Sequence, residues 1–146
     1  IMANRLKSLL NDYIHGDQNG FLPGRQIRNN LRTVIDVLEY YEAHSEKQVS
    51  LVFLDAQKAF DNLSWQFMIQ QIYNMNLGMN FEHTITAIYS RQRARIVVNR
   101  ELTTNIEIEK GVRQGCSLSP LLFILSLEIL HRRIRSNLKI KGLKIK

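Results

Sequence analysis

The chain has 146 residues, a net charge of +7 and a hydrophobic content of 45%, which suits one folded domain with a sizeable core. Its longest apolar stretch, 121–130, is too short to cross a bilayer, and no signal peptide is recognisable, so we expect an intracellular protein without membrane contact. The single cysteine, Cys116, excludes an intramolecular disulfide and a multi-cysteine zinc site.

Apolar periodicity predicts an α+β fold. Helices are expected near 2–15, 25–44, 64–76, 80–90 and 119–137. Strands are expected near 48–55, 92–99 and 103–109, with the last two joined as a hairpin around Asn99-Arg100-Glu101.

Two of these helices carry an apolar stripe that we expect to be buried. Ser64 is a natural cap for the third helix. The stripe of the second helix comprises Ile27, Leu31, Val34, Leu38 and Tyr41, and that of the third comprises Trp65, Met68, Ile69 and Ile72.

Residues 49–54 form an apolar run of strand length that ends at Asp55. Such a run suits a strand buried on both faces, and alternation would place Asp55 on the same face as Leu51 and Phe53. A carboxylate there is costly unless it meets a cation or several donors. Asp55 is therefore either a metal ligand or a cap for the turn that follows.

Residues 111–120 read Gly-Val-Arg-Gln-Gly-Cys-Ser-Leu-Ser-Pro and predict a tight polar turn that leads into a buried helix. Ser119 can cap this helix, and the proline after it suits the first helical position. Gly115 allows a close approach of backbone and ligand. The turn would present Arg113, Gln114 and free N–H groups to an anionic or nucleotide ligand, although a turn that binds nothing has the same local pattern.

These two segments resemble motifs of one enzyme family. Leu-Asp-Ala-Gln-Lys-Ala-Phe-Asp at 54–61 looks like motif A of reverse transcriptases, and Arg-Gln-Gly-Cys-Ser-Leu-Ser-Pro at 113–120 looks like motif B in its LINE-type (non-LTR retrotransposon) form. Upstream, Gln-Asn-Gly-Phe-Leu-Pro-Gly-Arg at 18–25 is similar to the family's fingers segment, and Ala-Asn-Arg-Leu at 3–6 to the helix before it. The resemblance covers essentially the whole chain in the expected order.

The resemblance implies a partial right-hand polymerase with helices packed on a small, mostly antiparallel sheet. Residues 1–46 would be fingers-side helices and residues 47–146 the palm core. The full-length parent would copy RNA into DNA, with an RNA template, a DNA primer and deoxynucleotides as partners. The family implies a cytoplasmic ribonucleoprotein and the nucleus as locations.

The resemblance also implies a role for individual residues. Asp55 would be the catalytic carboxylate that bridges two Mg²⁺ ions, and the Ala56 carbonyl would help to hold one of them. Phe60 would lie under the sugar and collide with a 2′-hydroxyl, whereas without the family an ordinary core aromatic would be the better interpretation. The residues expected to line the incoming nucleotide are Phe60, Arg113, Gln114 and Gly115.

The family takes its other metal-binding carboxylates from an aromatic-Ala-Asp-Asp box on a hairpin after motif B. Mg²⁺ relies on few protein carboxylates, so each one counts. No Asp follows motif B in this sequence. We therefore expect a chain that lacks the catalytic hairpin, does not polymerise alone and needs the rest of the polymerase to complete its palm. It should also expose a strand edge and apolar surface.

Arginines form two candidate nucleic-acid-binding groups. In the helix 25–44 they crowd the amino end, which is unfavourable for the helix dipole and suggests template phosphates as their partner, unless Arg32 simply pairs with Asp36. Arginines also alternate along one strand face, where Glu107 and Glu109 on the next strand could pair with them instead. The predicted nucleic-acid-binding residues are Arg25, Arg28, Arg32, Arg91, Arg93 and Arg95.

The last segment, 129–146, carries seven positive charges and no acid, which fits a phosphate-facing surface and a solvated helix face equally well. Three interpretations of function remain. The first is a piece of an RNA-directed DNA polymerase that is active only in its full-length parent. The second is a catalytically inactive nucleic-acid-binding relic or domesticated fragment, and the third is an expressed fragment without a function of its own.

Overall fold

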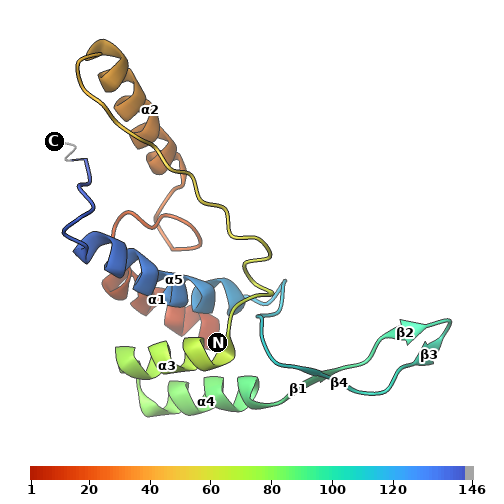
Figure 1. Cartoon of the computed structure of the whole chain (residues 1–146). Coiled ribbons are helices and arrows are strands. Elements are labelled where there is room, and N and C mark those ends of the chain that lie inside the picture. The colour runs from red at the N-terminus through yellow and green to blue at the C-terminus, as the bar shows by residue number, and fades with distance from the viewer. Residues whose placement is uncertain (144–146) are drawn as a thin grey trace. The chain divides into compact units, whose positions relative to one another are not determined.

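A computed structural model describes residues 1–143 of the chain. The chain divides into two compact units, Ile1–Gln57 and Lys58–Lys146, which are described separately below (Figure 1). No helix of the described residues is both long and apolar enough to cross a membrane. The helices and short antiparallel strands together confirm the α+β fold class.

The first unit contains helices α1 (Met2–Tyr13) and α2 (Arg28–Ala43), close to the predicted bounds. Helix α1 buries Leu6 and Leu10, whereas Val37 is the buried residue of α2. The predicted burial of the α2 stripe is wrong at three positions, because the exposed fractions of Ile27, Leu31 and Leu38 are 67%, 62% and 51%. Helical periodicity sets which residues share a face, but it supplies no surface to cover that face.

The strand predicted near 48–55 is also wrong. Residues 49–56 form no β-ladder with any part of the chain that the structure describes, and Phe53 and Leu54 are 77% and 83% exposed. A strand buried on both faces needs neighbouring strands for its N–H and C=O groups, and the described strands pair with one another instead. The motif A run is therefore an extended, exposed apolar segment.

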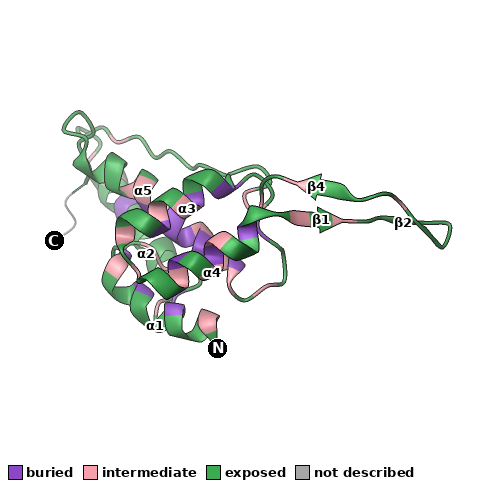
Figure 2. Cartoon of the chain, turned by 90° about the horizontal axis from the view of Figure 1, so that it is seen from below, coloured by how far each residue is buried: buried purple, intermediate pink, exposed green. Residues whose placement is uncertain are grey.

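The second unit contains α3 (Trp65–Met75), α4 (Met79–Ser90) and α5 (Ser119–Ser136), also close to prediction. Ser64 caps α3 as expected, since its hydroxyl accepts a hydrogen bond from the N–H of Phe67 at 3.4 Å. Helix α3 packs against both α4 and α5, and Figure 2 shows buried positions along all three. The fully buried side chains of this core include Met68, Ile72, Ile85, Leu122, Ile124 and Leu125.

A β-hairpin follows α4 and extends from the helices of the second unit (Figure 1). Strand β1 (Gln92–Ala94) pairs with β4 (Ile106–Ile108), and β2 (Val97–Val98) pairs with β3 (Glu101–Leu102). At the tip, Asn99 and Arg100 have φ angles of 53° and 72°, as expected for a turn that matches strand twist. The predicted hairpin is confirmed.

Candidate functional site

The end of motif A and the residues just before motif B pair through their backbones. The N–H of Val112 donates to the carbonyl of Phe60 at 2.8 Å, and the N–H of Gly111 donates to the carbonyl of Leu63 at 2.7 Å. Ser64 and Lys110 form an antiparallel bridge beside these bonds. Residues 46 to 52 positions apart are thereby fixed side by side inside the second unit.

Gly111 lies tightly against the motif A turn. Its φ is 89°, and a Cβ atom there would stand 2.9 Å from the carbonyl oxygen of Asp61. The indole N–H of Trp65 donates to the Gly111 carbonyl at 2.5 Å. The ammonium group of Lys110 donates to the side-chain oxygen of Asn62 at 2.9 Å. Residues 61–65 therefore make several contacts with Lys110 and Gly111.

The ring of Phe60 is half-buried and packs edge-on against the ring of Phe123 in α5. The ring centroids are 5.3 Å apart and the planes meet at 81°. Edge-to-face contact of this kind restricts the ring, so Phe60 has a defined place next to motif B.

The motif B turn presents exposed groups ahead of α5. Arg113, Gln114 and Gly115 are all exposed, and Gly115 has a φ of 81° with open space around its Cβ direction. The predicted cap by Ser119 is wrong. Ser119 is the first helical residue and only 1% exposed, and no side-chain hydrogen bond caps α5. Because the backbone is already helical at Leu118, the hydroxyl falls inside the first turn, where it cannot cap.

Two titratable groups flank this turn. A hydrogen bond from the backbone N–H of Leu118 lowers the pKa of the Cys116 thiol, and the positive charge of Arg113 acts in the same direction. Burial raises the pKa of the Tyr89 hydroxyl above its ordinary value. The turn therefore favours a negative charge on Cys116, as its proximity to the start of α5 predicts.

Asp55 and Ala56 belong to the first unit and are both exposed. No group of three or more His, Cys, Asp or Glu side chains within residues 1–143 could hold a metal ion. The predicted metal ligands therefore provide a single carboxylate and an adjacent carbonyl, both reachable from solvent.

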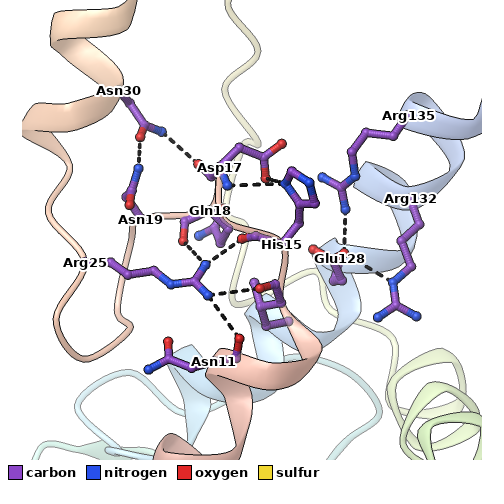
Figure 3. A network of polar contacts seen from close by, with 11 residues as sticks. Asn11, His15, Asp17, Gln18, Asn19, Arg25, Asn30, Glu128, Arg132 and Arg135 are labelled. Carbon is purple, nitrogen blue, oxygen red and sulfur yellow. Dashed lines mark hydrogen bonds and ion pairs between the residues drawn. The ribbon is translucent and has the colours of Figure 1, made fainter.

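Arg25 has a structural environment that the sequence did not indicate (Figure 3). Its guanidinium group donates to the carbonyls of His15 at 2.5 Å, Gln18 at 2.9 Å, Ile14 at 3.0 Å and Asn11 at 3.3 Å. One side chain thus holds the end of α1 and the loop after it together. Every residue has a backbone carbonyl, so residue types do not indicate which carbonyls accept hydrogen bonds. The sequence therefore showed only the charge of Arg25.

Three of the other predicted arginines have protein partners. The Nε of Arg32 lies 2.7 Å from the Asp36 carboxylate, as the helical alternative foresaw. Arg93 pairs with Glu107 across β1 and β4 at 3.2 Å, as the cross-strand alternative foresaw. The Nε of Arg95 donates to the Asn105 side chain at 2.8 Å.

Arg28 and Arg91 differ from these three arginines. Both are exposed, and neither side chain has a hydrogen bond or an ion pair among the residues that the structure describes. Their guanidinium groups are therefore available to an external anion.

Sequence reasoning missed a buried acid in α5. Glu128 is 1% exposed, and its Oε1 accepts from Arg132 at 3.2 Å and from Arg135 at 2.5 Å (Figure 3). The spacing of four between Glu128 and Arg132 was the available signal for one of these pairs.

The chain matches the family model "Reverse transcriptase (RNA-dependent DNA polymerase)" over residues 1–144. The chain belongs to the reverse transcriptase family. It is 33% identical over 124 residues to "Transposon TX1 uncharacterized 149 kDa protein" of Xenopus laevis, a match of 85% of this chain and 9% of that protein. The predicted family resemblance is thus confirmed.

Two further relatives are R2 retrotransposon polyproteins. The chain is 26% identical over 138 residues to the "type-1 retrotransposable element R2" polyprotein of Nasonia vitripennis, covering 94% of this chain. It is 27% identical over 141 residues to the "type-2 retrotransposable element R2DM" polyprotein of Drosophila melanogaster, covering 97% of this chain. The chain spans 9% to 13% of the length of these three relatives.

Proposed function

We propose that this reverse transcriptase chain is part of an RNA-directed DNA polymerase of a non-LTR retrotransposon. The polymerase copies RNA into DNA by nucleotidyl transfer. The observation that carries the proposal is the backbone pairing of Val112 with Phe60, because it joins the end of motif A to the residue directly before motif B. The chain that contains both motifs matches the family over residues 1–144. The same matches favour this function over a catalytically inactive binding relic.

In this proposal the second unit selects and orients the nucleotide. Arg113, Gln114 and the exposed backbone at Gly115 would contact its phosphates and base, since a helix amino end and a guanidinium group both favour an anion. Phe60 would lie under the sugar and exclude a 2′-hydroxyl. Its contact with Phe123 supports this role, because a ring that selects by steric exclusion must be held in place.

Reverse transcriptases are in general metal-dependent. The exposed carboxylate of Asp55 and the carbonyl of Ala56 are oxygen donors, which is the ligand chemistry that Mg²⁺ prefers, and these residues would hold it. Bound Mg²⁺, in the two-ion form proposed here, would activate the primer 3′-hydroxyl and neutralise the leaving pyrophosphate.

The template, the primer and the deoxynucleotides would be the partners of this polymerase. We assign residues 1–46 to its fingers side and residues 47–146 to its palm core, with the cytoplasmic ribonucleoprotein and the nucleus as locations. Arg28 and Arg91 would make the strongest template contacts because they have no internal partner, whereas the pairs of Arg32, Arg93 and Arg95 must first be released.

The test measures Mg²⁺-dependent extension of a DNA primer on an RNA template by the polypeptide that the gene encodes around residues 1–146. Asp55→Asn should lower kcat by at least about two orders of magnitude, because it removes the charge of a metal ligand. Asp12→Asn, an exposed change in α1, is the matched control and should retain activity. Primer extension that survives Asp55→Asn, or that is absent from the unaltered protein, would contradict the proposal.

A further inference from the structure

Trp65, the only tryptophan of the chain, makes a long-range polar contact inside the second unit. Its side chain is 7% exposed, and its indole N–H donates to the carbonyl of Gly111, which is 46 residues further along the chain. The ring of Tyr89 packs against the indole at 5.6 Å with an interplanar angle of 62°. The indole is thus held by packing as well as by its hydrogen bond.

Gly111 is fixed from three directions by residues 61–65. Its N–H donates to Leu63, its carbonyl accepts from Trp65, and the carbonyl of Asp61 occupies the space that a side chain would need. The next residue, Val112, donates to Phe60, and Arg113 follows directly. A shift at Gly111 would therefore move the motif B turn relative to Phe60.

We propose that Trp65 is a positioning residue: through Gly111 it sets the register between the Phe60 turn and the turn at 113–115. The register role stands on the contacts alone, and its consequence for nucleotide selection rests on the proposed function. In a backbone pairing a slip of one residue sends side chains to the opposite face. If Phe60 moved away from residues 113–115, its ring would no longer block the space that a 2′-hydroxyl needs. Small displacements strongly affect reacting geometry.

The register role is tested by amide hydrogen exchange on the 146-residue chain. Trp65→Phe keeps an aromatic ring against Tyr89 but removes the N–H donor. Protection of the Gly111 and Val112 amides should fall roughly threefold to tenfold, as expected for one lost hydrogen bond. Tyr73→Phe, a change at an exposed position of the same helix, is the control and should leave both amides unchanged. Unchanged protection in Trp65→Phe would overturn the proposal.

A second pair of variants does not depend on the indole. Gly111→Ala places a Cβ against Asp61, whereas Gly78→Ala introduces the same positive-φ strain in open space at the start of α4. Gly111→Ala should reduce protection of the Val112 amide, and Gly78→Ala should not. Equal effects of the two alanines would show that backbone strain alone acts at Gly111 and would overturn its register role.

The consequence for selection is measured in the encoded polymerase as the ratio of kcat/KM for deoxynucleotides to that for ribonucleotides. Trp65→Phe should lower this ratio by roughly tenfold. A merely structural role would lower the active fraction equally for both nucleotides, and an unchanged ratio would therefore overturn the selection half. If the unaltered protein incorporates no nucleotide, the proposed function fails, and hydrogen exchange alone decides the register role.

Discussion

Helices α2 and α5 are both amphipathic by sequence, yet they differ in what covers their apolar faces. Helix α5 buries Leu121, Leu122, Ile124 and Leu125, each at most 3% exposed. Helix α2, in the first unit, leaves most of its apolar stripe exposed. An apolar period of 3.6 residues thus identifies a helix and its face, whereas burial depends on a partner surface elsewhere in the fold.

Charged pairs in the same two helices show a parallel difference. Arg32 and Asp36 form an exposed pair on α2, with side chains 71% and 45% exposed. Glu128 of α5 is almost fully buried and accepts from two arginines. Spacing of four residues indicated the Arg32–Asp36 pair, and the same spacing, which sequence reasoning missed, is present at Glu128–Arg132. Only burial distinguishes a weak surface pair from a consequential one.

Replacing a buried and an exposed leucine should give the largest difference. Leu122→Ala leaves a cavity in α5 and should lower the free energy of unfolding by about 2–5 kcal/mol. Leu38→Ala in α2 should cost below about 0.5–1 kcal/mol, because Leu38 is 51% exposed. Urea unfolding followed by Trp65 fluorescence and circular dichroism measures both. Equal losses would mean that α2 is covered in solution.

Neutralising one acid in each charged pair should give a smaller difference. Glu128→Gln keeps the shape of the side chain but leaves the guanidinium groups of Arg132 and Arg135 without their carboxylate. We expect a loss of about 1–3 kcal/mol, below the full cost of an uncompensated buried charge because both arginines reach solvent. Asp36→Asn should cost at most about 0.5 kcal/mol. Thermal unfolding of the two variants in the same buffer makes the comparison, and a larger loss in Asp36→Asn would contradict it.

The smallest expected effect concerns Tyr89 at alkaline pH. Burial raises its pKa above the ordinary value of 10.0, so the folded state holds the proton more tightly than the unfolded state does. The resulting stabilisation is fully present below pH 10.0 and is lost as the pH rises through the folded-state pKa. Tyr89→Phe should therefore show a shallower loss of stability above this pH. Chemical denaturation across the alkaline range measures the two slopes, and identical slopes would be inconsistent with a buried phenol.

Local chemistry allowed several features to be predicted from the sequence. The helices, the cap at Ser64 and the hairpin tip at Asn99 follow from apolar periodicity and from residue types that suit a cap or a turn. Motifs A and B identified the family. The sequence did not predict the backbone hydrogen bond between Val112 and Phe60. Whether Asp55 binds metal remains a prediction.

Features that depend on distant neighbours were decided by the tertiary structure. Leu54 is exposed because no described strand pairs with its segment, although its sequence suits a buried strand. Arg25 binds four backbone carbonyls, and Trp65 binds Gly111 from 46 residues away. The sequence alone determined local conformation and family membership, since both depend on residues that are close together in the sequence. Burial and the partners of polar groups were determined only by the fold, because they depend on contacts between residues that are far apart in the sequence.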